Sequence, residues 1–264
     1  MDTLILGDRM LGYTDAGQGA VPIVLIHGFC GDVRYWQEVI PVISTHTRVI
    51  APDLRGHGTS SAYESPFTLE DLADDIAALL DHLHVERVQL WGHSLGGYTA
   101  LAFAQRYPSR IAGLALIHST SFADTEEGKA NPDKGITAIR DNGLHSYVDG
   151  LIPKLFAPDH LHTMPKLIAE TKEIGYGTDS GTAIHTMAAM RDRPDRTAVL
   201  HELTVPVLLV AGAADQIFPP ERVFSLTKPS VHPILLPSAG HMSMLESPDA
   251  LNQQLVDFLQ KSGY

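Results

Sequence analysis

Short apolar runs recur along the chain, and most of them lack alternating polar positions. Near-continuous Val, Ile and Leu runs are typical of strands that are buried on both faces of a sheet. The predicted strands cover residues 23–26, 48–52, 87–91, 111–117, 206–211 and 232–236. The first twenty residues, with Gly12, Gly17 and Gly19, instead indicate a leading antiparallel hairpin.

Helical patterns separate these strands. Apolar residues recur at helical spacing over 69–83, where Thr68 precedes the pattern and Asp71 completes an approximate capping box. A second helix is predicted to begin at Pro248, with an apolar face over 251–259. Alternating strands and helices predict an α/β fold with a mostly parallel sheet covered on both faces.

One interval departs from this alternation. Successive strands are separated by about 20 to 35 residues, whereas residues 118–205 contain nearly 90, which is too many for one crossover helix. Weak helical patterns at 136–148 and 183–190 are predicted to be interrupted by prolines. These are Pro153, Pro158, Pro165 and Pro194. We therefore expect a core of residues 1–118 and 206–264, with a small helical cap inserted at 119–205.

Composition excludes several classes of protein. The 264 residues are 44% hydrophobic and carry a formal net charge of −12, which disfavours nucleic acid and anionic lipid as partners. The single cysteine, Cys30, cannot form an internal disulfide, and no apolar run approaches the roughly 20 residues of a membrane span. We expect a soluble, cytoplasmic protein without membrane association. The sequence does not indicate an oligomeric state.

The segment Gly92-His93-Ser94-Leu95-Gly96 carries the strongest chemical signal. It matches the G-x-S-x-G pattern, with a predicted strand just before it and a helical pattern over 98–107 just after it. Such a sharp turn exposes the serine hydroxyl above the sheet edge, and its glycines allow strand and helix to approach closely. The alternative interpretation is a serine in an ordinary glycine-rich turn or a degenerate phosphate loop. A Walker loop would require Lys and then Ser or Thr after the last glycine, where this chain has Tyr98.

A serine hydroxyl becomes an effective nucleophile only beside a base that an acid orients. The chain offers fourteen histidines as candidates for the base. Because ligand-binding loops follow the carboxyl ends of parallel strands, the base is expected in one of these loops. Asp215 follows the predicted strand at 206–211, and His241 follows the strand at 232–236. The chain therefore presents serine, acid and base in that order.

These motifs resemble the α/β-hydrolase family. The resemblance covers His27-Gly28-Phe29, the segment from Asp53 to Ser60, the serine turn, Gly212-Ala213-Ala214-Asp215 and Gly240-His241. It implies Ser94 as the nucleophile, His241 as general base and then acid, and Asp215 as the carboxylate that fixes the imidazole tautomer. It also implies an oxyanion hole formed by the backbone N–H groups of Phe29 and Leu95.

Other polar residues receive structural interpretations. Asp53 is the second candidate for the acid, although its loop is expected to have a structural role. His93 is expected to pack in the interior rather than act as a base. His118, at a strand end, is considered for the pocket mouth but not selected. The pairs His82/His84 and His160/His162 diverge on a helix and lack further ligands, so we predict no metal and no cofactor. The methionines of the insertion suggest either an adaptable substrate lining or ordinary packing. They are Met164, Met187 and Met190.

A serine at position 94 argues against the aspartate-nucleophile members of the family, the haloalkane dehalogenases and epoxide hydrolases. We expect a small-molecule carboxylesterase that forms an acyl-enzyme on Ser94. Alternatives with the same residues are an enol-lactone hydrolase, a thioesterase, a perhydrolase and a carbon–carbon bond hydrolase. A receptor that retains these residues but turns over slowly is the alternative outside enzymes. No substrate-binding residue is selected, and the acyl and alcohol groups are left open.

Overall fold

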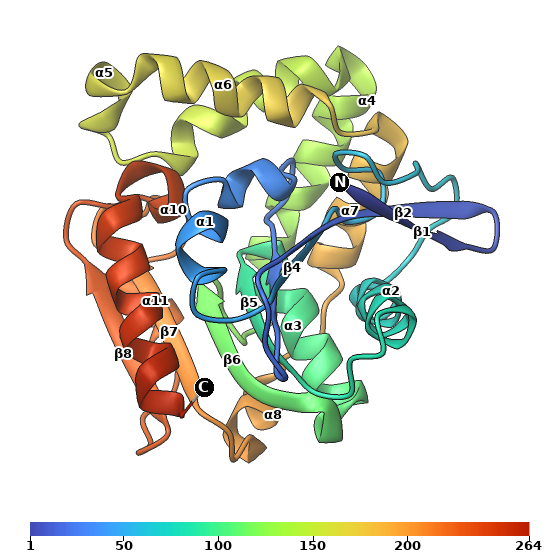
Figure 1. The fold of residues 1–264 in the computed structure, drawn as a ribbon. Helices are drawn as coiled ribbons and strands as arrows, with labels where there is room; N and C mark the ends of the chain where they lie inside the picture. The colour runs from blue at the N-terminus through green and yellow to red at the C-terminus, as the bar shows by residue number, and fades with distance from the viewer. Residues whose placement is uncertain (264) are drawn as a thin grey trace.

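A computed structural model describes residues 1–263, which form one eight-stranded sheet flanked by helices (Figure 1). The predicted strands are all present within two residues of their expected bounds, and the leading hairpin is formed by the first two strands. The strands are β1 (Asp2–Leu6), β2 (Arg9–Ala16), β3 (Ile23–Ile26), β4 (Val49–Pro52), β5 (Val88–His93), β6 (Ile111–Ile117), β7 (Val207–Gly212) and β8 (Val231–Leu236).

The sheet has the strand order β1-β2-β4-β3-β5-β6-β7-β8. The first two pairings, β1 with β2 and β2 with β4, are antiparallel, and every later pairing is parallel. The carboxyl ends of β3 to β8 therefore lie along one edge. Loops that follow neighbouring strands are brought together at this edge, although they lie far apart in the sequence.

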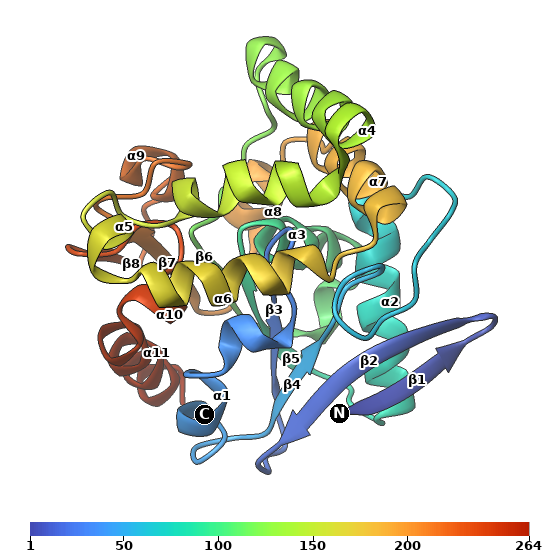
Figure 2. The same cartoon turned by 90° about the horizontal axis from the view of Figure 1, so that it is seen from above.

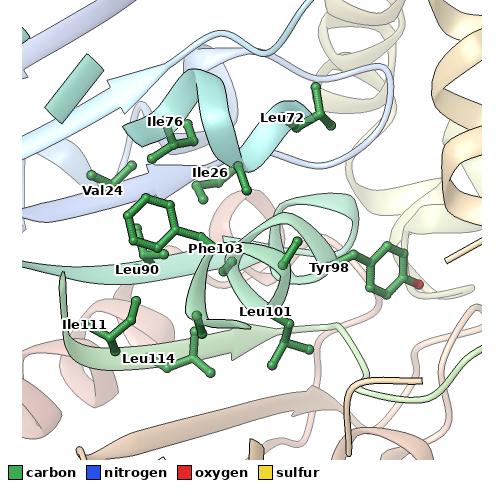
Figure 3. Close-up of a cluster of buried hydrophobic side chains, with 14 of the residues drawn as sticks. Val24, Ile26, Leu72, Ile76, Leu90, Tyr98, Leu101, Phe103, Ile111 and Leu114 are labelled. Atoms are coloured by element: carbon green, nitrogen blue, oxygen red, sulfur yellow. The ribbon is translucent and has the colours of Figure 1, made fainter. Parts of the chain in front are cut away.

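Residues of the central strands alternate between two apolar cores. Val24 and Ile26 face the first core, which is covered by α2 (Leu69–His82) and α3 (Leu95–Arg106) (Figure 3). Leu25 faces the second core, against the 3-10 helix η1 (Val33–Trp36), α1 (Ile40–Ile43), α10 (Ser243–Glu246) and α11 (Pro248–Ser262). Both faces of the sheet are thus buried, which explains why these strands have no polar alternation.

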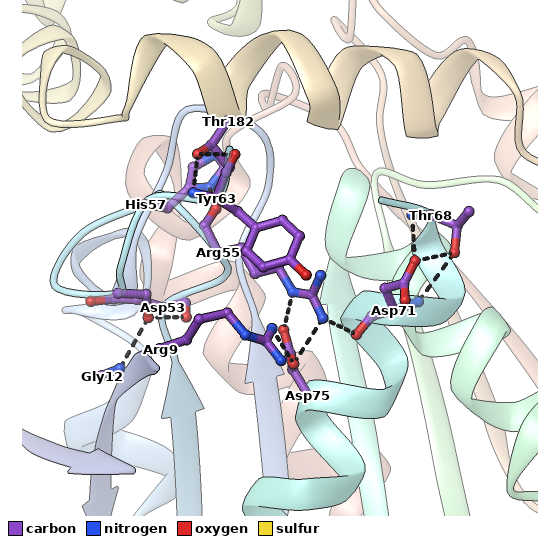
Figure 4. Close-up of polar contacts among 11 residues, drawn as sticks. Arg9, Gly12, Asp53, Arg55, His57, Tyr63, Thr68, Asp71, Asp75 and Thr182 are labelled. Carbon is purple, nitrogen blue, oxygen red and sulfur yellow. Dashed lines mark hydrogen bonds and ion pairs between the residues drawn. The ribbon is translucent and has the colours of Figure 1, made fainter. Parts of the chain in front are cut away.

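Local sequence signals set the ends of two of these helices. Helix α2 begins with the predicted capping box, in which the Thr68 hydroxyl and the Asp71 carboxylate bind each other's backbone N–H (Figure 4). Helix α11 begins at Pro248 and ends at Gly263, whose φ of 78° stops the helix in the left-handed conformation. The start of α11 at Pro248 agrees with the prediction from the sequence.

Five helices fill the interval between β6 and β7. They are α4 (Glu126–Leu155), α5 (His160–Thr163), α6 (Pro165–Tyr176), α7 (Ser180–Arg191) and α8 (Thr197–Glu202). Helix α4 packs against both α6 and α7, and α4, α5 and α6 lie above the sheet when the molecule is viewed from the side (Figures 1 and 2). None of the helices within residues 1–263 has the length and apolar character that a membrane crossing requires.

The position of the break in this insertion differs from the prediction. Helix α4 continues through Pro132 and Pro153, and its only non-helical residue is Gly143, with φ 81° and ψ 161°. The predicted interruption at Pro153 is therefore wrong. A proline removes one N–H but keeps φ within the helical range, whereas a glycine at positive φ reverses the local direction of the chain. Helix α6 does begin at a proline, Pro165.

Candidate active site

Ser94 lies at a sharp turn between β5 and α3. Its backbone has φ 50° and ψ −113°, a conformation that costs a non-glycine residue about 1 to 3 kcal/mol. A Cβ atom on Gly92 would overlap the carbonyl of Gly96, and a Cβ on Gly96 would overlap the carbonyl of Ile26. The two glycines therefore permit the close contact of strand and helix that holds Ser94 in this conformation, as the motif predicts.

Four side chains with acid–base chemistry follow four neighbouring strands. Ser94 follows β5, His118 follows β6, Asp215 follows β7 and His241 follows β8. Because these strands are parallel, all four residues lie at the same edge of the sheet. The topology thus assembles the three selected residues and adds His118 to them.

Asp215 and His241 form a direct hydrogen bond. The Nδ1 atom of His241 lies 2.8 Å from Oδ2 of Asp215, and both side chains are buried. The other carboxylate oxygen, Oδ1, accepts the N–H groups of Ile217 at 2.7 Å and Phe218 at 3.0 Å. Burial alone would raise the pKa of Asp215, but the attraction of His241 and the hydrogen bonds from His118 and His241 hold that pKa well below its ordinary value.

This bond fixes the tautomer of His241. An ionised carboxylate can only accept, so Nδ1 carries the proton and Nε2 retains a lone pair. The backbone N–H of His241 donates to the carbonyl of Leu155 at 2.7 Å, and its own carbonyl lies 2.9 Å from Nε2 of His93. Ser94 and His241 line the same cavity. Within residues 1–263 no hydrogen bond joins the Ser94 hydroxyl to the His241 ring.

His93 and Asp53 take the structural places expected of them. His93 donates from Nε2 to the carbonyl of His241, and burial holds the pKa of His93 well below its ordinary value, so the ring stays neutral. Asp53 accepts the N–H groups of Val33 and Thr59, both at 2.8 Å. Asp53 therefore supports the loop after β4, and the carboxylate beside His241 is that of Asp215.

Two buried histidines secure the loop that contains Phe29. His27 donates from Nδ1 to the carbonyl of Gly28 at 2.7 Å, and its Nε2 accepts the N–H of Leu54 at 2.9 Å. His57 accepts the N–H of Cys30 at 3.3 Å. Burial lowers the pKa of both rings, to about 3 for His57, so both remain neutral acceptors. The loop is therefore fixed by groups other than the backbone N–H of Phe29.

The N–H groups of Phe29 and Leu95 make no hydrogen bond within the part of the chain that the structure describes. Leu95 is the first residue of α3, whose initial N–H groups have no intrahelical acceptor. A developing negative charge on a reacting oxygen would be stabilised by such donors and by the positive end of the helix dipole.

A cavity of about 410 Å³ opens beside Ser94 and His241. Apolar side chains from the core and the insertion line much of it, including Phe29, Leu151 and Met187. Met190 also lines the cavity, whereas Met164 lies outside it, before α6. Two of the three methionines therefore line the cavity, and an adaptable substrate lining stays a prediction, since Met187 also packs in the second apolar core.

The structure also reveals site residues that the sequence did not single out. Glu246, whose side chain is fully buried, accepts the N–H groups of Gly240 and Met242 on either side of His241, both at 3.0 Å. It also accepts the N–H of Ala157 at 2.7 Å and lies 2.6 Å from Nδ1 of His160. Glu246 thereby links the His241 loop to the inserted helices. No motif marks it, because Ala157 and His160, two of its four partners, come from a distant segment.

His118, Asp215 and His241 form the one group among the described residues whose side chains could together hold a metal ion, with candidate ligand atoms within 4.8 Å of one another. The sequence offered only histidine pairs two residues apart as possible metal ligands. This group could not be found that way, because its three members come from three separate loops. Here the two rings approach the same carboxylate oxygen, Oδ2 of Asp215. This arrangement of donors around one acceptor suits an imidazole–carboxylate hydrogen-bond network, and the absence of a metal stays a prediction.

Known proteins with the same architecture match most of the chain. A profile for the alpha/beta hydrolase fold matches residues 21–142. The dihydrolipoyllysine-residue acetyltransferase component of the acetoin cleaving system of Pseudomonas putida is 34% identical over 262 residues, covering 97% of this chain and 68% of that protein.

Two solved structures are similar over nearly their whole length. A thermophilic esterase from Thermogutta terrifontis, determined with malate bound, is 33% identical with a TM-score of 0.89, covering 96% of this chain and 94% of the other. The enol-lactonase from Burkholderia xenovorans LB400 is 28% identical with a TM-score of 0.90, covering 98% and 100%. With the mostly parallel sheet and the serine turn after β5, these similarities establish that the chain belongs to the α/β-hydrolase family.

Proposed function

We propose that the protein is a serine hydrolase that cleaves carboxylic ester bonds of small molecules through an acyl-enzyme on Ser94. The observation that carries this proposal is the 2.8 Å contact between His241 and Asp215, which leaves His241 Nε2 as a free base in the cavity that Ser94 lines. The similarity to an esterase at 33% identity supports the same bond specificity.

In the proposed reaction, the Ser94 hydroxyl attacks the ester carbonyl while His241 Nε2 accepts its proton. The tetrahedral intermediate then collapses, and His241 returns the proton to the departing alcohol. Water, deprotonated by His241, then attacks the acyl-enzyme, and His241 returns this proton to the Ser94 oxygen as the carboxylic acid is released. Asp215 holds the imidazole in the required tautomer and stabilises its cationic form.

The N–H groups of Phe29 and Leu95 are proposed to stabilise the negative oxygen of both tetrahedral intermediates. Their freedom from other hydrogen bonds supports this role. The helices within residues 119–205 are proposed to act as a cap, because α4 and α7 contribute side chains to the cavity beside Ser94. The core of residues 1–118 and 206–264 would then supply the chemistry and the cap would supply specificity.

The proposal is tested by turnover of p-nitrophenyl esters together with labelling by a fluorophosphonate probe. The Ser94→Ala variant is expected to lose at least about 10⁴-fold in kcat and all labelling. The matched control is Ser180→Ala, which alters an exposed serine at the start of α7 and is expected to retain both signals. Undiminished turnover or labelling in Ser94→Ala would exclude Ser94 as the nucleophile.

A second candidate, hydrolysis of an enol-lactone, is favoured by the TM-score of 0.90 with the Burkholderia enol-lactonase. The chemistry is the same, except that the leaving enol stays attached to the acid product. A competition between a lactone and a linear ester of the same acyl length distinguishes the two functions. Faster opening of the lactone would favour this candidate, and faster cleavage of the linear ester would reject it.

A further inference from the structure

Three charged side chains line the cavity beside Ser94: Asp124, Arg193 and Arg222. Arg193 donates to Asp124 through two nitrogen atoms, at 2.7 Å and 3.0 Å, and to the carbonyl of Met190 at 2.6 Å. Its guanidinium also lies 4.1 Å from the centre of the Tyr98 ring. The charge of Arg193 is therefore balanced within the protein.

Arg222 differs from Arg193 in having no such partner. Its backbone is fixed, since its N–H donates to the carbonyl of Pro219 and its own carbonyl accepts the Thr120 hydroxyl at 2.8 Å. Its side chain makes no hydrogen bond or ion pair within residues 1–263. A partly buried guanidinium loses hydration without gaining a counter-charge, which is unfavourable unless an anion binds there.

Tyr98 supplies a second polar group to the same cavity. Its ring belongs to the first apolar core, while its hydroxyl points out of that cluster (Figure 3) and makes no hydrogen bond to another described residue. The positive charges of Arg193 and, more weakly, Arg222 favour ionisation of this phenol, and the Asp124 carboxylate opposes them. Burial nevertheless raises the pKa of Tyr98 to about 12, so the hydroxyl remains a donor at neutral pH.

We propose that Arg222 and the Tyr98 hydroxyl bind a carboxylate of the substrate, so that the preferred substrates are small esters or lactones that carry a free carboxylate group. This inference rests on the proposed ester hydrolysis and specifies its substrate class. A guanidinium binds a carboxylate through two parallel hydrogen bonds, and the phenol adds a third donor.

The number of charges favours a carboxylate over a phosphate. A phosphate monoester carries close to two negative charges at pH 7, and the second cation of the cavity, Arg193, already pairs with Asp124. The Asp215 carboxylate does not compete for Arg222, because its oxygens are taken by two histidine rings and two backbone N–H groups. Phe218 and Ile217, beside Asp215, extend the apolar lining of the cavity. A substrate with an apolar middle and a single terminal charge fits this lining.

The test compares two esters of equal reach, mono-p-nitrophenyl adipate and its neutral analogue methyl p-nitrophenyl adipate, in the full-length protein. Wild type is expected to favour the carboxylate ester in kcat/KM. Arg222→Gln is expected to lower kcat/KM for the carboxylate ester by about 10- to 100-fold and for the neutral ester by less than about twofold. Tyr98→Phe is expected to lower the first value by a smaller factor. Equal losses on both esters would overturn the proposal.

The matched control is Arg140→Gln, which removes the same charge from an exposed position on α4 outside the cavity. Arg140→Gln is expected to leave the preference for the carboxylate ester unchanged. If it lowered kcat/KM for that ester as much as Arg222→Gln does, the effect would come from net charge and the proposal would be overturned. Should Arg222→Gln fail to fold, Arg222→Lys and wild type in 1 M NaCl replace it. Both are expected to reduce the preference, and an unchanged preference in both would overturn the proposal.

A binding measurement separates this inference from the proposed function. Adipate is expected to raise the melting temperature of wild type and of Ser94→Ala, but not of Arg222→Gln, whereas neutral adipamide is expected to raise none of them. Stabilisation by adipate without turnover of any ester would retain the subsite and reject the esterase. Rapid turnover of esters with no preference and no stabilisation by adipate would reject the subsite and retain the esterase.

Discussion

The Nδ1 atom of His118 lies 3.3 Å from Oδ2 of Asp215, the same oxygen that accepts the hydrogen bond from His241. Its Nε2 atom lies 2.7 Å from the hydroxyl of Ser243, and the ring is fully buried. Burial lowers the pKa of His118, so the ring is neutral. A neutral ring with Nδ1 donating to Asp215 must accept the Ser243 proton at Nε2. His118 thus orients the carboxylate that orients His241.

Replacing His118 tests this positioning role. His118→Ala is expected to lower kcat about 10-fold with little change in KM, because Asp215 loses one donor while the cavity wall stays intact. His118→Asn is expected to recover part of the rate, since its amide can donate from nearly the same place. Steady-state kinetics on one ester measures both effects. Full activity in His118→Ala would contradict the role, as would a change confined to KM.

The glycine contact at the serine turn predicts a large difference between two Gly→Ala variants. Gly96→Ala is expected to lower the free energy of unfolding by more than about 3 kcal/mol or to prevent folding, because its Cβ would overlap the carbonyl of Ile26. At Gly150, in α4, no atom lies within 4 Å of the position of an added Cβ. Gly150→Ala is therefore expected to raise the free energy of unfolding by about 0.5 to 1 kcal/mol. Urea unfolding measures both. Similar values for the two variants would refute the contact.

Burial of neutral histidines predicts a loss of stability in acid. The pKa of His57 is lowered to about 3, so the unfolded chain binds a proton below about pH 6.5 that the folded chain excludes. This ring therefore lowers the free energy of unfolding as pH falls from about 6.5 towards 3, by at most about 1.4 kcal/mol per pH unit. His57→Gln, whose amide oxygen can still accept the Cys30 N–H, is expected to show a shallower slope in urea unfolding from pH 7 to 4.5. Equal slopes for the two proteins would contradict the assigned neutral state.

Glu246 predicts a coupled loss of stability and activity. In Glu246→Gln the new NH₂ group faces N–H donors from Ala157, Gly240 and Met242, and at least one hydrogen bond is lost. The free energy of unfolding is expected to fall by about 2 to 4 kcal/mol, and kcat is expected to fall because the His241 loop loosens. Glu173→Gln, on the exposed face of α6, serves as the control and is expected to change neither quantity. If Glu246→Gln kept the wild-type free energy of unfolding and kcat, Glu246 would have no positioning role for His241.

Much of the fold could be predicted because its signals are local. The strands buried on both faces are visible as unbroken apolar runs, and the Thr68–Asp71 capping box marks the start of α2 within one turn of the chain. The turn at Ser94 also carries a local signal, since Gly92 is required by its contact with the carbonyl of Gly96. The requirement for Gly96 comes from Ile26 on β3 and is not local. The break in α4 was misplaced because the sequence does not reveal that Gly143 adopts a positive φ.

The sequence by itself determined the order of strands and helices, the serine turn and the candidate acid and base, because each depends on residues that are neighbours in the chain. Only the tertiary structure decided which distant groups meet. Examples are His118 with Asp215, Glu246 with Ala157 and His160, and Arg222 with Tyr98 in one cavity. These relationships depend on the pairing of parallel strands and on the docking of the inserted helices, which bring together side chains that no local pattern connects.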